Sequence, residues 1–308
     1  MIDPTLLQPD RKGADPVGVV GLGIMGSEYA RHLLAAGYRV CGFDVAADRL
    51  ANFEAAGGIV CASAGDVAAR AVVVLTALSS LPAYQQAVLA SDGVAGHVGS
   101  RSIVVDTGTF PLELKQEAQR VFALRGARMV DAPVTGTRVH AERKELVVYA
   151  SGREGDVREV RPVLEAFARD VRYVGAFGAG IKLKLVTNHL VAVHTAAAAE
   201  ALSLAKSAGL DLQMVYDLIA GGPASSAVFG FRGPLIVADK FVPATMRMDV
   251  FEKDLDTING FREQVAAVTP LLDASCALYK QALADGMHEQ DISAAYRVLR
   301  ERSGRGKK

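Results

Sequence analysis

The feature that most restricts the fold is a glycine-rich segment close to the N-terminus. An apolar, β-branched run begins at Val17 and leads directly into Gly21–Gly26, which has the pattern G-x-G-x-x-G, and a helix-like stretch follows. Three glycines in this strand-to-helix context are typical of dinucleotide-binding folds. Gly21 permits the tight turn, Gly23 lets a pyrophosphate approach the backbone, and Gly26 allows close packing of the helix on the strand.

An acidic residue completes this pattern. The second apolar run, Tyr38–Phe43, ends at Asp44, which is placed to accept hydrogen bonds from the ribose hydroxyls of the cofactor. A carboxylate there repels a 2′-phosphate, so NAD is predicted, with NADP as the alternative because Arg49 lies nearby. The predicted cofactor-binding residues of this region are Gly21, Leu22, Gly23, Ile24, Met25, Gly26 and Asp44.

The first half of the chain alternates strands with helices. The expected strands cover residues 17–21, 39–43, 71–77, 102–106, 128–131, 145–151 and 171–174. Strands that alternate with helices at this spacing predict βαβ units and a mostly parallel, doubly wound sheet. Ligands of such sheets bind at the carboxyl ends of the strands.

The pattern changes after about residue 178, where strand signals stop and helical periodicity continues. Helices are expected at 181–208, 212–220, 234–238, 248–265, 270–284 and 292–302. The predicted fold class is therefore α/β, with a Rossmann-type NAD(P)-binding domain at residues 1–178. An all-α substrate and dimerisation domain at 179–308 follows, and a substrate is expected in the cleft between the two.

Composition excludes several classes of function. The 34 Lys and Arg residues balance the 34 Asp and Glu residues, which argues against a nucleic-acid partner. No apolar stretch reaches the length of a membrane span, and residues 1–16 do not resemble a secretion signal, so a cytoplasmic protein is expected. The 3 cysteines are widely spaced, and no metal site or disulfide framework is predicted.

Lys184 is the strongest candidate for a catalytic residue. Glycines at 178 and 180 precede the long predicted helix, so Lys184 falls in its first turns, with Asn188 on the same face. Apolar neighbours, the helix N-terminus and a cationic nicotinamide would lower the pKa of the amine. A proton-shuttling group needs this near neutral pH. Taken alone, a helical lysine is more often a solvated charge, and Lys182 is the natural control.

Two further segments are candidates for substrate contacts. Thr135, Gly136 and Thr137 follow a short strand, and their hydroxyl and backbone N–H groups can cradle a carboxylate. An ordinary strand-to-loop turn is the alternative. Lys253 can offer a positive charge to a substrate carboxylate, although a surface pair with Asp254 is the commoner explanation.

Taken together, these motifs resemble the β-hydroxyacid dehydrogenase family, the relatives of 3-hydroxyisobutyrate dehydrogenase. The matching segments, in order, are 21–26, 131–136, 178–188, 253–255 and 291–294, and the resemblance extends from about residue 17 to residue 300. It implies oxidation of a small 3-hydroxy acid to a semialdehyde or oxo acid, or the reverse reduction. Lys184 would then be the catalytic acid/base.

The resemblance also implies roles for other residues. Thr135, Gly136, Thr137 and Asn188 would hold the substrate, Thr109 and Lys253 would lie near the nicotinamide, and Leu78 and Ser79 would flank the cofactor. Thr137 departs from the family pattern because it replaces a glycine, which leaves the identity of the substrate open. Residues 251–255 resemble the sugar-acid members, such as threonate dehydrogenases. The expected partners are a hydroxy acid or semialdehyde and a second copy of the chain, in a homodimer or homotetramer.

Three alternatives remain beside this interpretation. Decarboxylating 6-phosphogluconate dehydrogenases share the lysine helix, but they carry His where this chain has Thr187, and their helical domain is larger. Imine reductases share the architecture and typically lack the lysine. Non-catalytic cofactor-binding relatives also tend to lose it. Lys184 therefore argues against the last two.

Overall fold

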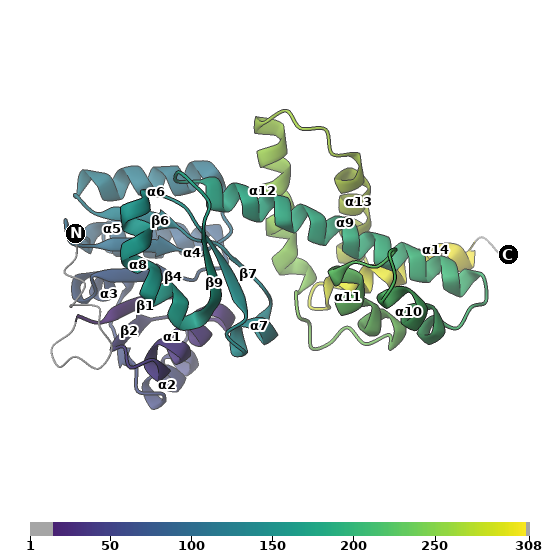
Figure 1. Cartoon of the computed structure of the whole chain (residues 1–308), viewed down its shortest axis with the longest axis horizontal. Helices are drawn as coiled ribbons and strands as arrows, with labels where there is room; N and C mark the ends of the chain where they lie inside the picture. Colours follow the sequence, from purple (N-terminus) through teal and green to yellow (C-terminus); the bar gives the residue numbers. More distant parts are fainter. Residues whose placement is uncertain (1–14, 306–308) are drawn as a thin grey trace. The chain divides into compact units, whose positions relative to one another are not determined.

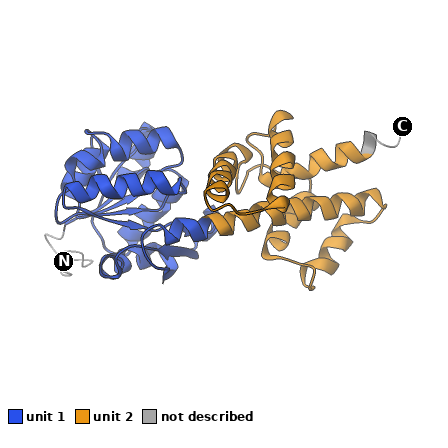
Figure 2. Ribbon diagram, turned by 90° about the horizontal axis from the view of Figure 1, so that it is seen from above, with its two compact units in different colours: residues 1–184 blue, residues 185–308 orange. Residues whose placement is uncertain are grey.

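The computed structural model describes residues 15–305. The chain divides into two compact units, unit 1 reaching to Lys184 and unit 2 beginning at Leu185 (Figure 2). Helix α9 (Ala179–Ser207) is continuous through this boundary, and the predicted division after residue 178 falls at its start. The expected absence of a secretion signal concerns residues 1–16, nearly all of which lie outside the described residues.

Unit 1 contains a six-stranded parallel sheet with the strand order β3-β2-β1-β4-β5-β6 (Figure 1). Its strands are β1 (Val17–Val20), β2 (Val40–Phe43), β3 (Ile59–Val60), β4 (Val73–Thr76), β5 (Ile103–Asp106) and β6 (Arg128–Asp131). The order of strands reverses beside β1, which confirms the predicted doubly wound sheet. Ligands of such sheets bind outside the carboxyl ends of the strands at this reversal.

Helices cover both faces of the large sheet. Because successive side chains of a strand point to opposite faces, Val104 and Val105 of β5 belong to different core clusters. Helices α1 and α8 contribute to the cluster of Val105, and helices α3 and α6 to that of Val104. The helices of unit 1 are α1 (Ile24–Ala35), α2 (Ala47–Ala55), α3 (Ala64–Arg70), α4 (Leu81–Tyr84), π-helix η2 (Gln85–Leu89), α5 (Val94–His97), α6 (Leu112–Leu124), α7 (Arg138–Glu142) and α8 (Glu154–Phe167).

A second sheet holds two of the predicted strands. Strands β7 (Val134–Thr135), β8 (Leu146–Ala150) and β9 (Ala168–Tyr173) form it, with β7 and β8 antiparallel. The segment between β7 and β8 is shorter than the crossover that parallel neighbours need, so the chain turns back on itself here. An antiparallel bridge between Asp131 and Ser151 joins the end of β6 to the end of β8.

Unit 2 is helical throughout its described part, as predicted. After α9 come α10 (Leu212–Ala220), α11 (Ala227–Val237), α12 (Met248–Gln264), α13 (Pro270–Ala284), the 3-10 helix η3 (Ile292–Ala294) and α14 (Ala295–Arg305). Helix α11 begins well before the expected start at Pro234, because the Ser226 hydroxyl caps it by accepting the Phe229 N–H. Within residues 15–305, no helix has both the length and the apolar character that crossing a membrane requires.

Candidate active site

The glycine loop after β1 has three glycines with different physical tasks. Gly21 has φ +90°, and a Cβ there would lie 2.6 Å from the Ala77 carbonyl oxygen. A Cβ on Gly26 would lie 1.8 Å from the Gly21 carbonyl oxygen, so the turn and the packing of α1 require both glycines. At Gly23 a Cβ would meet only Arg49 Nη1, at 3.7 Å. Packing within the chain does not require this glycine, and the close approach of a ligand explains it.

Asp44 connects the end of β2 to this loop. Its buried carboxylate accepts the Leu22 N–H at 2.7 Å and the Ala46 N–H at 2.9 Å. Arg49 Nη1 forms an ion pair with the same carboxylate at 3.2 Å. Since Gly23 offers no capping side chain to α1, the first amides of this helix suit an anion. The glycine loop, the helix start and the acid together fit a dinucleotide.

The loops after β4 and β5 lie at the same edge of the sheet as the glycine loop, because β1, β4 and β5 are parallel neighbours. Leu78 and Thr109 are half-buried there, and Ser79 is exposed. The Thr76 hydroxyl donates to Asp106 Oδ1 at 2.8 Å, and the Gly108 N–H donates to the same oxygen at 3.0 Å. These bonds fix the start of the loop that carries Thr109.

The turn predicted to hold the substrate has an internal hydrogen bond that the sequence did not indicate. Gly136 has φ +132°, and a Cβ there would lie 2.6 Å from Leu146 Cδ2, which explains the glycine. The Thr137 N–H donates to His140 Nδ1 at 3.1 Å, and the Thr137 hydroxyl lies 2.9 Å from the same nitrogen. One of the amides expected to receive a carboxylate is thus bonded within the turn.

Lys184 lies in the second turn of α9 and is half-buried, whereas Lys182 is exposed. Ile181 and Leu185, three residues before and one after Lys184, are 0% and 1% exposed. Leu183, by contrast, is 38% exposed, so apolar packing borders Lys184 on one side of the helix only. Lys184 therefore lies at the margin of the face by which α9 is packed.

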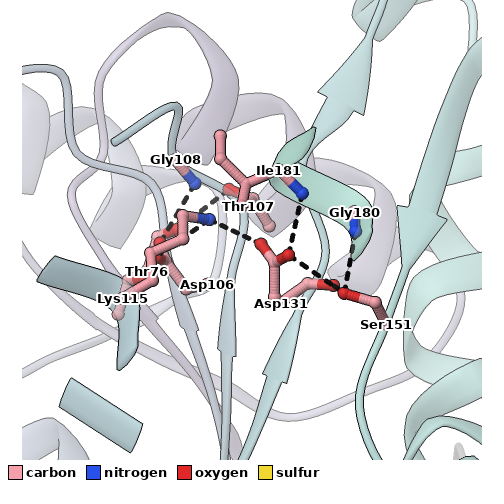
Figure 3. Close-up of polar contacts among 9 residues, drawn as sticks. All are labelled: Thr76, Asp106, Thr107, Gly108, Lys115, Asp131, Ser151, Gly180 and Ile181. Atoms are coloured by element: carbon pink, nitrogen blue, oxygen red, sulfur yellow. Dashed lines mark hydrogen bonds and ion pairs between the residues drawn. The ribbon is translucent and has the colours of Figure 1, made fainter. Parts of the chain in front are cut away.

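A buried charged network behind these loops was missed by sequence reasoning (Figure 3). Lys115 of α6 is fully buried, with its Nζ 2.7 Å from Asp131 Oδ1 and 3.2 Å from Asp106 Oδ2. Burial acts to lower the pKa of Lys115, but the two carboxylates outweigh it and hold the pKa above its ordinary value. The available signal was the spacing of Lys115 from Ala118 and Phe122, which places a lysine on the apolar face of a helix.

Unit 2 brings two predicted site residues to one carboxylate. Asn188 of α9 donates from Nδ2 to Asp254 Oδ2 at 2.9 Å, and Lys253 Nζ lies 2.7 Å from Asp254 Oδ1. Asn188 and Asp254 are both buried, so the Lys253–Asp254 pair is not the surface pair considered above. Asp254 was not predicted as a site residue. Among the described residues, no group of three or more His, Cys, Asp or Glu side chains is arranged to hold a metal ion.

Two family models together match nearly all of the chain. The NAD binding domain of 6-phosphogluconate dehydrogenase matches residues 16–175. The model described as NAD-binding of NADP-dependent 3-hydroxyisobutyrate dehydrogenase matches residues 178–299. The two matches meet close to the start of α9.

Individual relatives cover the chain equally well. L-threonate dehydrogenase of Cupriavidus necator is 32% identical over 284 residues, which cover 92% of this chain and 95% of that protein. The crystal structure of 3-hydroxyisobutyrate dehydrogenase from Salmonella typhimurium superposes with a TM-score of 0.83 at 31% identity, covering 92% of this chain and 99% of that one. The Mycobacterium tuberculosis 3-hydroxyisobutyrate dehydrogenase solved with L-serine gives a TM-score of 0.82 at 28% identity, with coverages of 93% and 99%.

Proposed function

Because the chain belongs to the β-hydroxyacid dehydrogenase family, as an NAD(P)-dependent oxidoreductase of the 3-hydroxyisobutyrate dehydrogenase type, we propose that it oxidises a small 3-hydroxy acid or reduces the corresponding carbonyl. The nicotinamide supplies the hydride chemistry. Lys184 takes the proton of the substrate hydroxyl during oxidation and returns it during reduction. The observation that carries this assignment is the position of Lys184, a half-buried residue in the first turns of α9.

The other predicted residues bind and orient. Thr135 and Gly136 hold the substrate carboxylate through hydroxyl and amide groups, and Thr137 shapes that turn with His140. Asn188 keeps its amide oxygen and one amide hydrogen for the substrate, because its contact with Asp254 uses a single donor. Lys253, which Asp254 holds in place, offers its ammonium group to the substrate carboxylate. Leu78, Ser79 and Thr109 line the cofactor.

A four-carbon sugar acid is the substrate class that we favour. The L-threonate dehydrogenase of Cupriavidus necator is similar over 92% of the chain. Thr137 also adds a hydroxyl where the family pattern has a glycine. Although this hydroxyl lies 2.9 Å from His140 Nδ1, its oxygen can still accept a hydrogen bond from a further hydroxyl group of a substrate. The first substrate to test is therefore L-threonate.

The proposal is tested by following reduced nicotinamide absorbance with a panel of acids. The panel contains L-threonate, 3-hydroxyisobutyrate, L-serine, glycerate and 4-hydroxybutyrate, each with NAD and with NADP. Semialdehydes and a cyclic imine are tested with the reduced cofactors. Turnover with kcat/KM highest for L-threonate is the expected result. Turnover of a cyclic imine alone would favour an imine reductase, and cofactor binding without any turnover would favour a non-catalytic role.

NAD is the proposed cofactor, because Asp44 places a carboxylate at the ribose position. Arg49, bound to that carboxylate, is the cation that would partner a 2′-phosphate. We expect kcat/KM to be higher with NAD than with NADP. The variant Arg49→Ala should raise the ratio of kcat/KM with NAD to kcat/KM with NADP, because it weakens the use of NADP selectively. Initial rates with both cofactors measure it. A lower ratio of kcat/KM with NAD to kcat/KM with NADP in Arg49→Ala would contradict the role of Arg49 as the partner of a 2′-phosphate.

We also propose that a second copy of the chain covers helix α10. This helix has an apolar sequence, yet none of its residues is buried. Met214 and Leu218, one turn apart on the same face, are 46% and 74% exposed, and Leu204 near the end of α9 is 71% exposed. Exposed apolar side chains on one face of a helix without buried residues are typical of a surface that a subunit covers.

Leu218→Glu is expected to shift the protein from oligomer to monomer, because the carboxylate would have to be buried in the contact without a partner. Light scattering coupled to gel filtration measures the mass. Leu124→Glu is the matched control, since Leu124 of α6 is 89% exposed in unit 1. An unchanged mass in Leu218→Glu, or equal dissociation in both variants, would place the interface elsewhere.

A further inference from the structure

Two loops of the candidate site begin at one buried cluster of polar side chains, which we call the loop-anchor network. It consists of Asp106, Lys115, Asp131 and Ser151, all fully buried (Figure 3). Asp106 ends β5 and starts the loop to Thr109. Asp131 ends β6 and starts the segment that leads to Thr135.

The same network binds the first turn of α9. Asp131 Oδ2 accepts the Ile181 N–H at 2.8 Å and the Ser151 hydroxyl at 2.9 Å. Ser151 Oγ accepts the Gly180 N–H at 2.9 Å. Two amides that an isolated helix start would leave without partners are thus satisfied by side chains from two different sheets.

Gly180 shows how closely the helix start lies on the network. A Cβ built on this residue would be 2.4 Å from the Tyr149 carbonyl oxygen and 2.9 Å from Asp131 Oδ2. Any larger side chain would push the helix away from the strand ends. The contact is therefore tight enough to define where the first turn begins.

The N-terminus of α9 also compensates charge in the loop-anchor network. Lys115 carries one positive charge between two buried carboxylates, which leaves one excess negative charge in the core of unit 1. The N-terminus of a helix carries a partial positive charge of roughly +0.5. The start of α9 therefore compensates Asp131 electrostatically, so that displacement of the helix would leave a buried carboxylate poorly stabilised.

We propose that Asp131 and Ser151 are positioning residues for Lys184, an inference that rests on the proposed function. Lys184 follows Ile181 by three residues in the same continuous helix. Fixing the Gly180 and Ile181 amides fixes the axial position and rotation of this first segment, and with them the location of the Lys184 amine. Asp131 also begins the segment that ends in the Thr135 turn. One carboxylate therefore sets the spacing between the acid/base and the residues that hold the substrate.

Ser151→Ala tests this with a small change, because it removes the acceptor of the Gly180 N–H and the donor to Asp131. The matched control is Ser293→Ala in unit 2. The Ser293 hydroxyl is equally buried and donates to another buried aspartate, Asp291, at 2.6 Å. Asp131→Asn serves as a second variant that keeps the side-chain shape and removes the charge.

Two measurements on the full-length, cofactor-saturated protein are compared. Amide hydrogen exchange over residues 178–188 is expected to accelerate in Ser151→Ala and Asp131→Asn and to remain unchanged in Ser293→Ala. For the preferred hydroxy acid, we expect kcat to fall by roughly 10- to 100-fold in the first two variants, since small misplacements of catalytic groups have effects of this size. KM for the cofactor should change little in all three.

The outcomes separate this inference from the proposed function. Unchanged exchange, or faster exchange with an unchanged kcat, would overturn the positioning role. An equal loss of kcat in Ser293→Ala would also overturn it, because the effect would then be general destabilisation. If Lys184→Ala retained full turnover, the proposed acid/base would fail, whereas the exchange data would still report whether the network holds the helix start.

Discussion

Replacement of Lys184 by alanine is expected to lower kcat by about 10²- to 10⁴-fold, the usual contribution of a general acid or base. The variant loses the amine that accepts the hydroxyl proton, and the carbonyl product forms only as that proton leaves. Cofactor affinity should be retained, because the glycine loop and Asp44 are formed by β1, α1 and β2, with no contribution from α9. Steady-state kinetics and calorimetric titration with NAD measure the two quantities separately.

Lys182→Ala is the matched control for this prediction. Lys182 belongs to the same turn region of α9 and has the same charge, but its side chain is exposed where that of Lys184 is half-buried. Its removal should leave kcat close to that of the unchanged protein. Equal losses in the two variants would indicate a general electrostatic effect on substrate binding, and full activity of Lys184→Ala would exclude Lys184 as the acid/base.

Asp291→Asn is expected to lower the free energy of unfolding by about 3–5 kcal/mol, the cost of leaving a buried charge without its partner. Asp291 is fully buried and forms an ion pair with Arg232, which is 3% exposed. Its carboxylate also accepts hydrogen bonds from the backbone N–H and the hydroxyl of both Thr245 and Ser293. It thus ties the start of η3 to α11 and to the segment before α12.

Thermal or urea denaturation monitored by circular dichroism measures the loss. The control is Asp249→Asn, which breaks an ion pair with Arg247 whose side chains are 33% and 45% exposed. Exposed pairs contribute roughly 0–1 kcal/mol, so this variant should unfold nearly like the parent. A loss in Asp291→Asn no larger than that in the control would contradict the proposed role of the buried pair.

The same carboxylate predicts a pH dependence of stability. Burial acts to raise the pKa of Asp291, but Arg232 and the surrounding hydrogen bonds prevail and hold the pKa below its ordinary value. A depressed pKa in the folded state means that the unfolded chain binds the proton first. The stabilisation is therefore complete above the unfolded pKa of about 3.9 and is lost as the pH falls through the lower folded pKa. Below about pH 4, the stability difference between the parent and Asp291→Asn should shrink.

The elements with long periodic patterns were predictable from sequence. The helices at 212–220 and 270–284 have the predicted bounds, and five of the six strands of the large sheet lie within a few residues of theirs. Strands β3 and β7 were missed because two residues carry no periodic signal. Helix α7 was missed because its capping pair joins Thr137 with a histidine at 140, where the usual signature has Glu or Gln.

The candidate site was only partly accessible to sequence reasoning. The glycine loop, Asp44 and Lys184 could be proposed because their chemistry depends on local spacing along one strand–helix unit or one helix. Asp254 and Lys115 could not, because each gains its significance from side chains on other elements, Asn188 in the first case and Asp106 with Asp131 in the second. The assigned roles of all these residues remain predictions for the experiments above.

The sequence by itself determined the alternation of strands and helices, the change to helices after residue 178 and the dinucleotide motif, since each depends on neighbours within about twenty residues. Only the tertiary structure decided that strands near 146–150 and 168–173 leave the large sheet, and that Asp131 holds the start of α9. The physical reason is that a buried hydrogen bond or ion pair is defined by the convergence of distant segments. Because its partners lie far apart in the sequence, they produce no periodic pattern from which the contact could be predicted.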